Sequence, residues 1–318
     1  MSDYAIGVDL GGTNLRVATM HRSGEIVERI SVPAKAHEGP DKLLERIAAT
    51  VNRAIDQLKR EGRKPLGVGI GVPGIIYMDQ GFVKDAPNLP GWTDLPVRER
   101  LEESVKCPVL LENDANAAAL GEKWMGRGRD TDHLCLLTLG TGVGGGFVMD
   151  GKIWHGFRGM AGEAGHINIY PDGVPCNCDG QGCLEQYASA TAVVREAEKA
   201  AREGLSPRLK HELDQSGKLT SKIVAQHAHQ GDKVAQAIYA DVGKALGIGL
   251  GTIINLLELP LCLLSGGMAA SWDLFAPAMF AQLEKGAYIY RAGGIRIESA
   301  ELDKDAGLFG AAYLPFQQ

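Results

Sequence analysis

Hydrophobic and polar residues alternate in the first part of the chain, and further along the apolar residues recur at helical spacing. Residues 4–10 and 15–18 alternate on either side of a glycine-rich segment, and residues 26–32 alternate again. Alternation is typical of half-buried strands, so the pattern predicts a hairpin that a third strand extends into a meander. Between Asp41 and Lys59 the apolar positions follow the period of an amphipathic helix.

The opening pattern returns about 130 residues later. An apolar segment at 134–139 runs into a Gly/Thr-rich turn at 140–146, and residues 147–149 resume a strand. This repetition suggests two related lobes joined by a hinge, because no low-complexity linker separates them. The predicted lobes are a small α/β lobe of residues 1–115 and 306–318, and a large α/β lobe of residues 116–305 that contains a metal-binding loop.

Shorter apolar patterns predict the remaining strands and helices. Strands are predicted at 67–71, 109–111, 261–264 and 295–297, and helices from Ala115, after residue 190, at 272–285 and at 306–314. The apolar stretch from Ala245 to Leu264 contains several glycines and is broken by Pro260. We therefore expect a buried helix followed by a strand, and no membrane span.

Composition and charge narrow the class of protein. The 318 residues are 45% hydrophobic and 23% charged, as in an ordinary soluble protein. A net charge of −6 and the lack of a long basic run argue against nucleic acid as the main partner. The N-terminus has no basic segment followed by an apolar one, so we expect no signal peptide and a cytoplasmic location.

Two glycine-rich turns could bind phosphate. In the first, Asp9 ends a strand and is followed by Gly11, Gly12, Thr13 and Asn14. Glycines let the backbone approach an anion closely, Thr13 adds a hydroxyl donor, and the Asp9 carboxylate suits a magnesium ion held through water. An ordinary hairpin turn explains this segment equally well, because a lone glycine motif is weak.

The second turn, with Thr141 and Gly142, strengthens the phosphate hypothesis. Two such turns from two lobes could grip a polyphosphate from opposite sides. A third element, Ser265 followed by Gly266 and Gly267, stands at a predicted strand-to-helix junction. A helix N-terminus with small residues there would let a nucleoside lie against the backbone.

Asp114 is the candidate catalytic residue. It follows a strand and precedes an Ala-rich helix, so it could simply be the N-cap of that helix. It could also be the general base that takes the proton of a sugar hydroxyl during phosphoryl transfer. The two roles are compatible, and Asn113 beside it offers the donor and acceptor that a polyol needs.

One histidine and three cysteines have the spacing of a zinc site. His166, Cys176, Cys178 and Cys183 would form a closed tetrahedral Cys₃His site, which implies a structural zinc ion. Unrelated free thiols are the alternative. If one ring nitrogen of His166 binds the metal, the other is free to meet a sugar hydroxyl, and Glu163 and Glu185 flank the loop as hydroxyl acceptors. His155 stands alone and is expected to be an ordinary surface or core histidine.

These motifs together resemble the ROK family of repressors and sugar kinases. The resemblance rests on the segments 9–14, 112–118, 140–146 and 162–166, and on the cysteine pattern ending in Leu184 and Glu185. It covers essentially the whole chain. One departure is Asp179, which stands directly after the second cysteine, where the family usually has glycine.

The resemblance implies an α/β fold of the actin-like ATPase (ribonuclease H-like) type, with two lobes and with ATP and sugar bound in a central cleft. It implies that Asp114 is the base and that Asn113, Glu163, His166 and Glu185 hold the sugar. It also implies that Asn88, near Gly74, lines the same pocket, and that the protein is a homodimer.

Several functions remain open. ROK repressors share the fold, but they carry an N-terminal helix-turn-helix domain, and here the first strand is expected by Tyr4. A sugar-binding protein without catalysis is disfavoured by the presence of Asp9, Thr13 and Asp114. Among kinases, a glucokinase is favoured by overall similarity, and fructokinase or N-acetylmannosamine and N-acetylglucosamine kinases are the alternatives.

Overall fold

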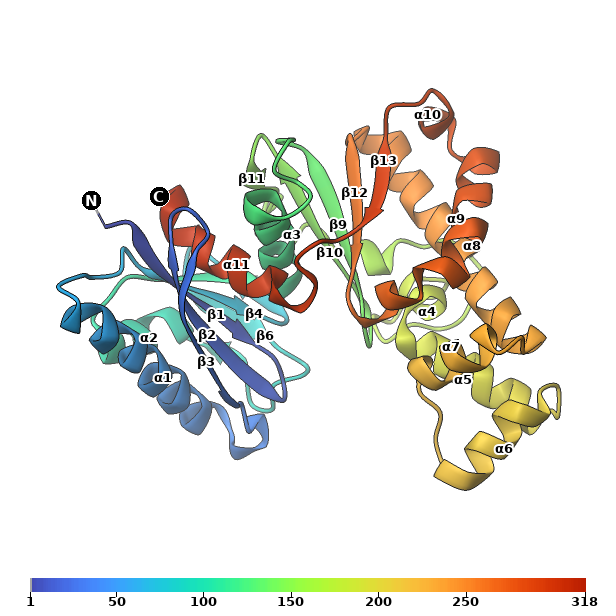
Figure 1. Ribbon diagram of the computed structural model, residues 1–318, viewed down its shortest axis with the longest axis horizontal. Coiled ribbons are helices and arrows are strands. Elements are labelled where there is room, and N and C mark those ends of the chain that lie inside the picture. Colours follow the sequence, from blue (N-terminus) through green and yellow to red (C-terminus); the bar gives the residue numbers. More distant parts are fainter. Residues whose placement is uncertain (1) are drawn as a thin grey trace. The chain divides into compact units, whose positions relative to one another are not determined.

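A computed structural model describes residues 2–318 (Figure 1). The chain divides into two compact units, which are described separately. Unit 1 comprises Met1–Leu134, Gly146–Gly162 and Ala300–Gln318, and unit 2 comprises Cys135–Gly145 and Glu163–Ser299.

Unit 1 is built on a five-stranded sheet in the order β3-β2-β1-β4-β8. Its strands are β1 (Tyr4–Leu10), β2 (Asn14–His21), β3 (Ile26–Pro33), β4 (Val68–Val72) and β8 (Val109–Asn113). The first three strands are antiparallel, and β4 and β8 run parallel to β1. The predicted hairpin and meander are confirmed.

The two faces of this sheet are covered by different helices. One face packs on α1 (Pro40–Arg60) and α2 (Val97–Val105), and the other on α11 (Ala306–Tyr313) (Figure 1). Glycines on the α11 side make close packing possible: a Cβ at Gly7 or Gly69 would overlap the backbone of α11. The amphipathic helix predicted from Asp41 to Lys59 is α1.

Unit 1 also contains elements that the sequence did not predict. These are a three-stranded sheet of β5 (Ile75–Tyr77), β6 (Phe82–Asp85) and β7 (Thr93–Leu95), the helix α2, and the short strand β11 (Lys152–Ile153). Each of these strands has two to four residues, which is too short to show alternation.

A second five-stranded sheet has the order β11-β10-β9-β12-β13, with β9 (Leu134–Leu139), β10 (Val143–Met149), β12 (Leu261–Ser265) and β13 (Arg296–Ser299). The helices of unit 2 are α4 (Glu185–Ala188), α5 (Ala190–Arg202), α6 (Pro207–Ser216), α7 (Ser221–His229), α8 (Lys233–Leu257), α9 (Trp272–Gly286) and α10 (Tyr288–Arg291). The predicted helical region after residue 190 is confirmed.

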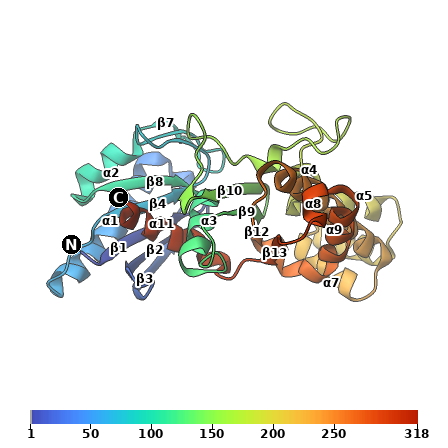
Figure 2. The same cartoon turned by 90° about the horizontal axis from the view of Figure 1, so that it is seen from above.

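Helix α8 is the core helix of unit 2. It is long and apolar enough to cross a membrane, but 67% of its most apolar window is buried by the protein itself. Figure 2 shows α4, α5 and α9 around it. At Gly243 a Cβ would overlap the carbonyl oxygen of Phe275, so glycine allows α9 to lie close. Burial therefore explains the apolar stretch, as the sequence predicted.

The units differ from the predicted lobes in their bounds. Helix α3 (Asp114–Met125) groups with unit 1, although residues from 116 onward were assigned to the large lobe. The reason is its packing against α11, where Gly121 and Gly310 bring the two backbones together. Residues 146–162 also group with unit 1.

Two local predictions are corrected. The segment 143–146, assigned to a turn, is part of β10, and a Cβ at Gly146 would lie 2.7 Å from the carbonyl oxygen of Ala115 in α3. After β12, a 3₁₀ turn (Gly267–Ser271) comes before α9, so Gly266 and Gly267 do not begin the α-helix itself.

Candidate functional site

Three parallel strands of unit 1 end side by side at one edge of their sheet. The register aligns Asp9 of β1 with Gly71 of β4, and Gly71 with Glu112 of β8. Carboxyl ends of parallel strands are the usual place for ligands in α/β proteins. The topology therefore brings Asp9 to the same edge as Asn113 and Asp114, which follow Glu112.

Asp9 is held by a charged network. Arg16 donates from Nε to Asp9 Oδ2 at 2.8 Å and also contacts this oxygen through a terminal nitrogen. Asp305 lies 3.5 Å from Arg16 and 2.9 Å from Arg29. Burial raises the pKa of Asp9, and Arg16 acts in the opposite direction. Arg16 and Asp305 were not predicted as site residues. Arg16 lies on the strand next to that of Asp9, and Asp305 is far along the chain from both, so local spacing does not indicate these contacts.

The first glycine turn lies beside Asn88. A Cβ at Gly12 would be 3.5 Å from the carbonyl oxygen of Asn88, and the Gly11 N–H donates to the carbonyl of Asn14 at 3.0 Å. The side chains of Thr13 and Asn14 are exposed. The turn therefore leaves an open hydroxyl and backbone, as a phosphate site requires.

Asn113, not Asp114, is the N-cap of α3. Its Oδ1 accepts from the backbone N–H of Ala115 at 2.9 Å and of Asn116 at 3.3 Å. Its Nδ2 donates to the carbonyl of Gly74 at 3.1 Å. Asp114 is the first residue of the helix, and its exposed carboxylate accepts from the Ala115 N–H at 2.9 Å. The capping role suggested for Asp114 is thus mainly that of its neighbour.

In unit 2, the second glycine turn is tied to Glu185. The backbone N–H of Val143 donates to Glu185 Oε2 at 2.9 Å. A Cβ at Gly142 would overlap this same oxygen. Thr191 also donates its hydroxyl to the carbonyl of Thr141 at 2.7 Å, so the turn is braced by the start of α5.

Thr141 and Gly267 line one cavity of about 640 Å³ in unit 2. Its walls are mostly small or apolar, including Ala190, Ala225 and Met268. Gly142 and Gly266 are not among the lining residues, although Gly266 follows β12 directly, with a φ of 90° that favours glycine. This cavity has the size and character expected of a nucleoside site.

The residues of α7 that form another wall of this cavity were not among the predicted site residues. Lys222, Ala225, Gln226 and His229 all come from α7 and line the cavity. They lie three or four residues apart on one face of the helix, and this spacing is the sequence feature that they share.

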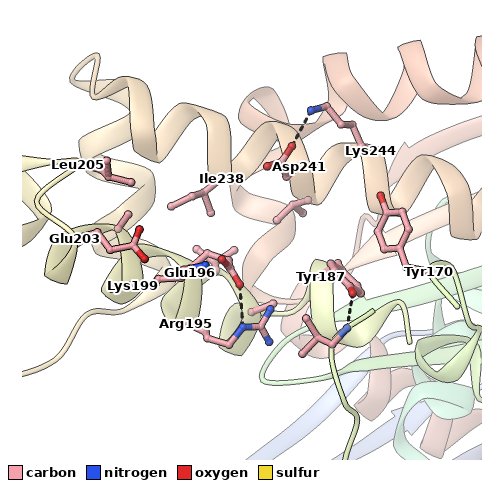
Figure 3. A pocket seen from close by; sticks show the side chains of 15 residues that line it. Tyr170, Tyr187, Arg195, Glu196, Lys199, Glu203, Leu205, Ile238, Asp241 and Lys244 are labelled. Carbon is pink, nitrogen blue, oxygen red and sulfur yellow. Dashed lines mark hydrogen bonds and ion pairs between the residues drawn. The ribbon is translucent and has the colours of Figure 1, made fainter. Parts of the chain in front are cut away.

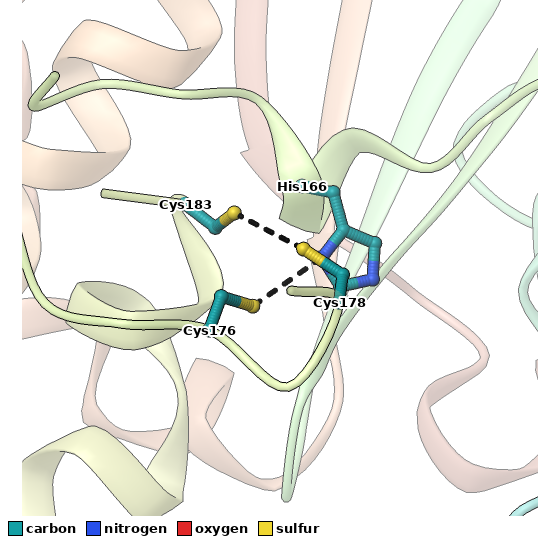
Figure 4. Close-up of side chains that lie close together, drawn as sticks. All are labelled: His166, Cys176, Cys178 and Cys183. Carbon is teal, nitrogen blue, oxygen red and sulfur yellow. Dashed lines mark hydrogen bonds between the residues drawn. The ribbon is translucent and has the colours of Figure 1, made fainter. Parts of the chain in front are cut away.

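The predicted zinc ligands lie together in unit 2. The ligand atoms of His166, Cys176, Cys178 and Cys183 are all within 4.8 Å of one another (Figure 4). Burial raises the pKa of Cys176, but hydrogen bonds from its neighbours outweigh it and lower the pKa to about 7. The pKa of Cys183 is raised to about 12 by burial and by the adjacent thiols. A divalent cation would stabilise all three thiolates, so the donor set fits zinc.

The two nitrogens of His166 face different groups. Nδ1 lies 3.7 Å from the sulfur of Cys176, and Nε2 lies 3.9 Å from a carboxylate oxygen of Glu163. The ring therefore points one nitrogen at the cysteines and the other away from them. Asp179, at the position where the family usually has glycine, has a φ of 63°, a conformation that glycine adopts more readily.

A separate cavity of about 600 Å³ contains none of the predicted site residues (Figure 3). Four of its charged side chains form pairs, Arg195 with Glu196 at 2.9 Å and Lys244 with Asp241 at 2.7 Å. It lies next to the metal loop, because Val174 and Tyr187 also line it.

The chain matches the family model described as "ROK family" over residues 5–318. A glucokinase from Halalkalibacterium halodurans is 38% identical, and the alignment covers 100% of this chain and 97% of that protein. A putative xylose repressor from Caldicellulosiruptor sp. is 32% identical over 96% of this chain, which spans 76% of the repressor.

Comparison with solved structures also finds similarity to ROK family proteins. A ROK family glucokinase from Streptomyces griseus, in complex with glucose and AMPPNP, has a TM-score of 0.80 and is 33% identical. The match covers 99% of this chain and 100% of that one.

Proposed function

Because this chain belongs to the ROK family, we propose that it is an ATP-dependent hexose kinase that transfers the γ-phosphate of ATP to the 6-hydroxyl of glucose. Membership of the family and the TM-score of 0.80 confirm the expected α/β fold of the actin-like ATPase type. A glucokinase is supported by similarity along the full chain to a named glucokinase and to a glucose-bound one.

The observation that carries the proposal is the placement of Asp114. Asn113 caps α3, and the exposed carboxylate of Asp114 therefore stands at the first position of that helix. A carboxylate there can accept the proton of a sugar hydroxyl as it attacks phosphorus. Phosphoryl transfer depends mainly on positioning and charge stabilisation, so a base on a rigid strand–helix junction is well suited to it.

We propose two groups of residues, one in each unit and considered separately, as candidates for binding the hexose. In unit 1 these are Asn113, Asp114, Gly74 and Asn88, and in unit 2 they are Glu163, His166 and Glu185. The contact between Asn113 and Gly74, and the exposed side chain of His166, whose Nε2 faces Glu163, support this assignment. Carboxylate, amide and imidazole groups are the donors and acceptors that sugar hydroxyls require.

We propose that each of the two glycine turns can bind phosphate, and that the cavity of unit 2 lined by Thr141 and Gly267 binds the nucleoside of ATP. Gly11, Gly12, Thr13 and Asn14 form the first turn, which follows the strand that ends near Asp9. Gly142 belongs to the second turn, and Gly266 directly follows β12. Oδ1 of Asp9 is the oxygen that Arg16 does not contact, so one carboxylate oxygen remains for water bound to magnesium. Magnesium would neutralise charge on the transferred phosphate.

We further propose that the four residues His166, Cys176, Cys178 and Cys183 hold one structural zinc ion. The ion would fix the loop that carries His166, and it would orient this ring toward the sugar. Homodimer formation and a cytoplasmic location remain predictions.

Two alternatives share the same fold. A transcriptional regulator is suggested by the 32% identity to a putative xylose repressor, and it would not need the Asp114 carboxylate. Kinases for fructose or N-acetylhexosamines would use the same base with another sugar.

A coupled ADP-release assay over a panel of hexoses tests the proposal. We expect turnover with ATP to be fastest on glucose, compared with fructose, mannose, N-acetylmannosamine and N-acetylglucosamine. A protein that turns over none of these sugars is not the proposed enzyme, and one that prefers another sugar is a kinase of different specificity.

The Asp114→Asn variant tests the role of the base. We expect kcat to fall by about 10²–10⁴-fold, the range for general-base assistance. Glucose binding, measured by calorimetry, should persist because the amide keeps the shape of the side chain. Glu99→Gln, an exposed carboxylate on α2, is the control and should keep the wild-type rate. Unchanged turnover in Asp114→Asn would contradict the mechanism.

A further inference from the structure

A buried carboxylate lies behind the proposed base. Glu112, the residue before Asn113, is only 2% exposed. Its Oε1 accepts from the backbone N–H of Asn113 at 2.9 Å and from Nδ2 of Asn116 at 2.9 Å. These two donors lie on either side of Asp114 along the chain. One carboxylate oxygen therefore fixes the last peptide of β8 and the first turn of α3 together.

The other oxygen of this carboxylate is bound by a histidine from a distant segment. His155 Nε2 lies 2.7 Å from Glu112 Oε2, and His155 is the second residue after the strand β11. His155 was expected to be an ordinary surface or core histidine, and its pairing with Glu112 was not predicted. A buried carboxylate without donors is costly, and among residues 2–318 His155 is the hydrogen-bond partner of Oε2.

A cavity of about 620 Å³ in unit 1 gives solvent access to His155, whose side chain is 39% exposed. Four charged side chains share the lining of this cavity with the pair: Asp79, Arg98, Glu102 and Lys152. The hydrogen bond to Glu112 raises the pKa of His155, while burial lowers it, and the nearby charge of Asp79 adds to the increase.

We propose that His155 is a positioning residue for phosphoryl transfer, which acts through Glu112 to fix the strand–helix junction that aims Asp114. This inference rests on the proposed kinase function. His155 contacts Glu112, and on this assignment it does not touch the substrate. Its effect is to hold Glu112 in the orientation in which one oxygen binds both Asn113 and Asn116.

The chemistry predicts which substitutions matter. In His155→Leu, Oε2 of Glu112 loses its donor while remaining buried, so the carboxylate would turn toward solvent or take up a proton. Either change disturbs the hydrogen bonds on both sides of Asp114. In His155→Gln, the amide nitrogen can occupy the place of Nε2 and donate to the same oxygen, so the junction should be kept.

Steady-state kinetics with glucose and ATP test the proposal. We expect His155→Leu to lower kcat by about tenfold to a hundredfold, the effect of misplacing a reacting group by up to about 1 Å. The KM values for glucose and ATP should stay within about twofold, because sugar and nucleotide contacts are not removed. His155→Gln should restore kcat to within about threefold of the wild type.

His133→Leu is the matched control. His133 is a half-exposed histidine of the same unit, and its Nε2 lies 3.7 Å from a carboxylate oxygen of Asp150 at the surface. It should keep the wild-type kcat. If His155→Leu also keeps it, the inference is wrong. The inference is equally wrong if His155→Leu and His155→Gln lose kcat and raise both KM values alike, since that result indicates a general folding role.

A second measurement examines the pair without catalysis. Because the pKa of His155 is raised in the folded protein, its contribution to stability is fully present below its ordinary value of 6.5. The contribution is lost as the pH rises through the raised pKa. The difference in Tm between wild type and His155→Gln should therefore shrink over that range, and a constant difference would contradict the pairing.

A wild-type protein with no turnover on any hexose would overturn the proposed function and this inference together, whereas an active wild type with an unaffected His155→Leu overturns this inference alone.

Discussion

At the scale of single residues, a position assigned to the sugar and one assigned to the nucleotide meet in unit 2. Glu185 was expected to hold sugar hydroxyls, and Gly142 was expected to approach phosphate. Oε2 of Glu185 accepts from the N–H of Val143, directly after Gly142. The absence of a side chain at Gly142 is what leaves room for this carboxylate. A single contact therefore links the two proposed binding functions.

Replacing Gly142 with alanine should displace Glu185, because the added Cβ would overlap its Oε2. We expect the KM for glucose to rise by about tenfold, the effect of losing about 1.4 kcal/mol of binding, and Tm to fall. Gly140→Ala is the control for stability, since a Cβ at Gly140 meets nothing within 4 Å, and its Tm should match the wild type. Kinetics and thermal unfolding measure the two effects. Equal Tm values for both variants would contradict the steric argument.

The zinc ligands could be predicted at this scale, but the pair of Glu112 and His155 could not. Three cysteines and a histidine close together in sequence carry a chemical signal of their own, and the structure brings their ligand atoms within 4.8 Å. His155 is 43 residues from Glu112, and nothing near either residue indicates the contact. Long-range pairs depend on how the strands are arranged, which local spacing does not encode.

At the scale of elements, one aspartate joins the N-termini of two helices in unit 2. Asp232 is the N-cap of α8 and accepts from the backbone N–H groups of Val234 and Ala235 at 2.9 and 3.0 Å. Its other oxygen binds the hydroxyl of Ser206, which caps α6. Burial raises the pKa of Asp232, but the hydrogen bond from Ser206 and those from the backbone outweigh it and lower the pKa.

Asp232→Ala should therefore destabilise the protein by about 1–2 kcal/mol, as loss of a helix cap does. Asp232→Asn is the comparison, because asparagine caps helices about as well but carries no charge. The wild-type carboxylate contributes its stability above its ordinary pKa of 3.8 and loses it as the pH falls through the lowered value. Urea unfolding at several pH values measures both effects. A variant Asp232→Asn with the same acid sensitivity as the wild type would contradict the assignment.

Long elements were predictable, and short ones were not. The amphipathic helix α1 covers 21 residues, so its apolar face repeats many times. The strands β5 and β7 have three residues each, and their place is set by pairing with β6 rather than by their own sequence. The extra length of β10 was hidden by its glycines, which are in a strand because α3 packs against Gly146.

At the scale of the whole molecule, the chain uses the same strand–turn–strand device once at the start of each unit. The turn after β1 and the turn after β9 both follow a buried strand, as the repeated pattern predicted. The boundaries of the units were harder to predict, because they depend on which helices pack together. The contacts of α3 with α11 decide that part of the division.

The proposed zinc ion is the feature of unit 2 on which the remaining prediction rests. The loop from His166 to Cys183 has few regular elements, and it carries one of the proposed sugar ligands. Without the ion, three closely spaced thiols and an imidazole would hold this loop only through weak hydrogen bonds of about 3.7 Å. The metal should therefore be needed both for stability and for sugar binding.

Cys178→Ser tests this, because Cys178 is an exposed ligand and its substitution leaves no cavity in the core. We expect elemental analysis to find one zinc ion per wild-type chain and much less in the variant. Tm should fall by about 5 °C or more, as expected for a loss of a few kcal/mol in a protein of this size. The KM for glucose should rise more than the KM for ATP, because the loop carries His166. Cys107→Ser, at a half-buried cysteine of unit 1, should keep its zinc and its kinetics. A variant that loses zinc but keeps the wild-type KM for glucose would show that the metal does not orient the sugar site.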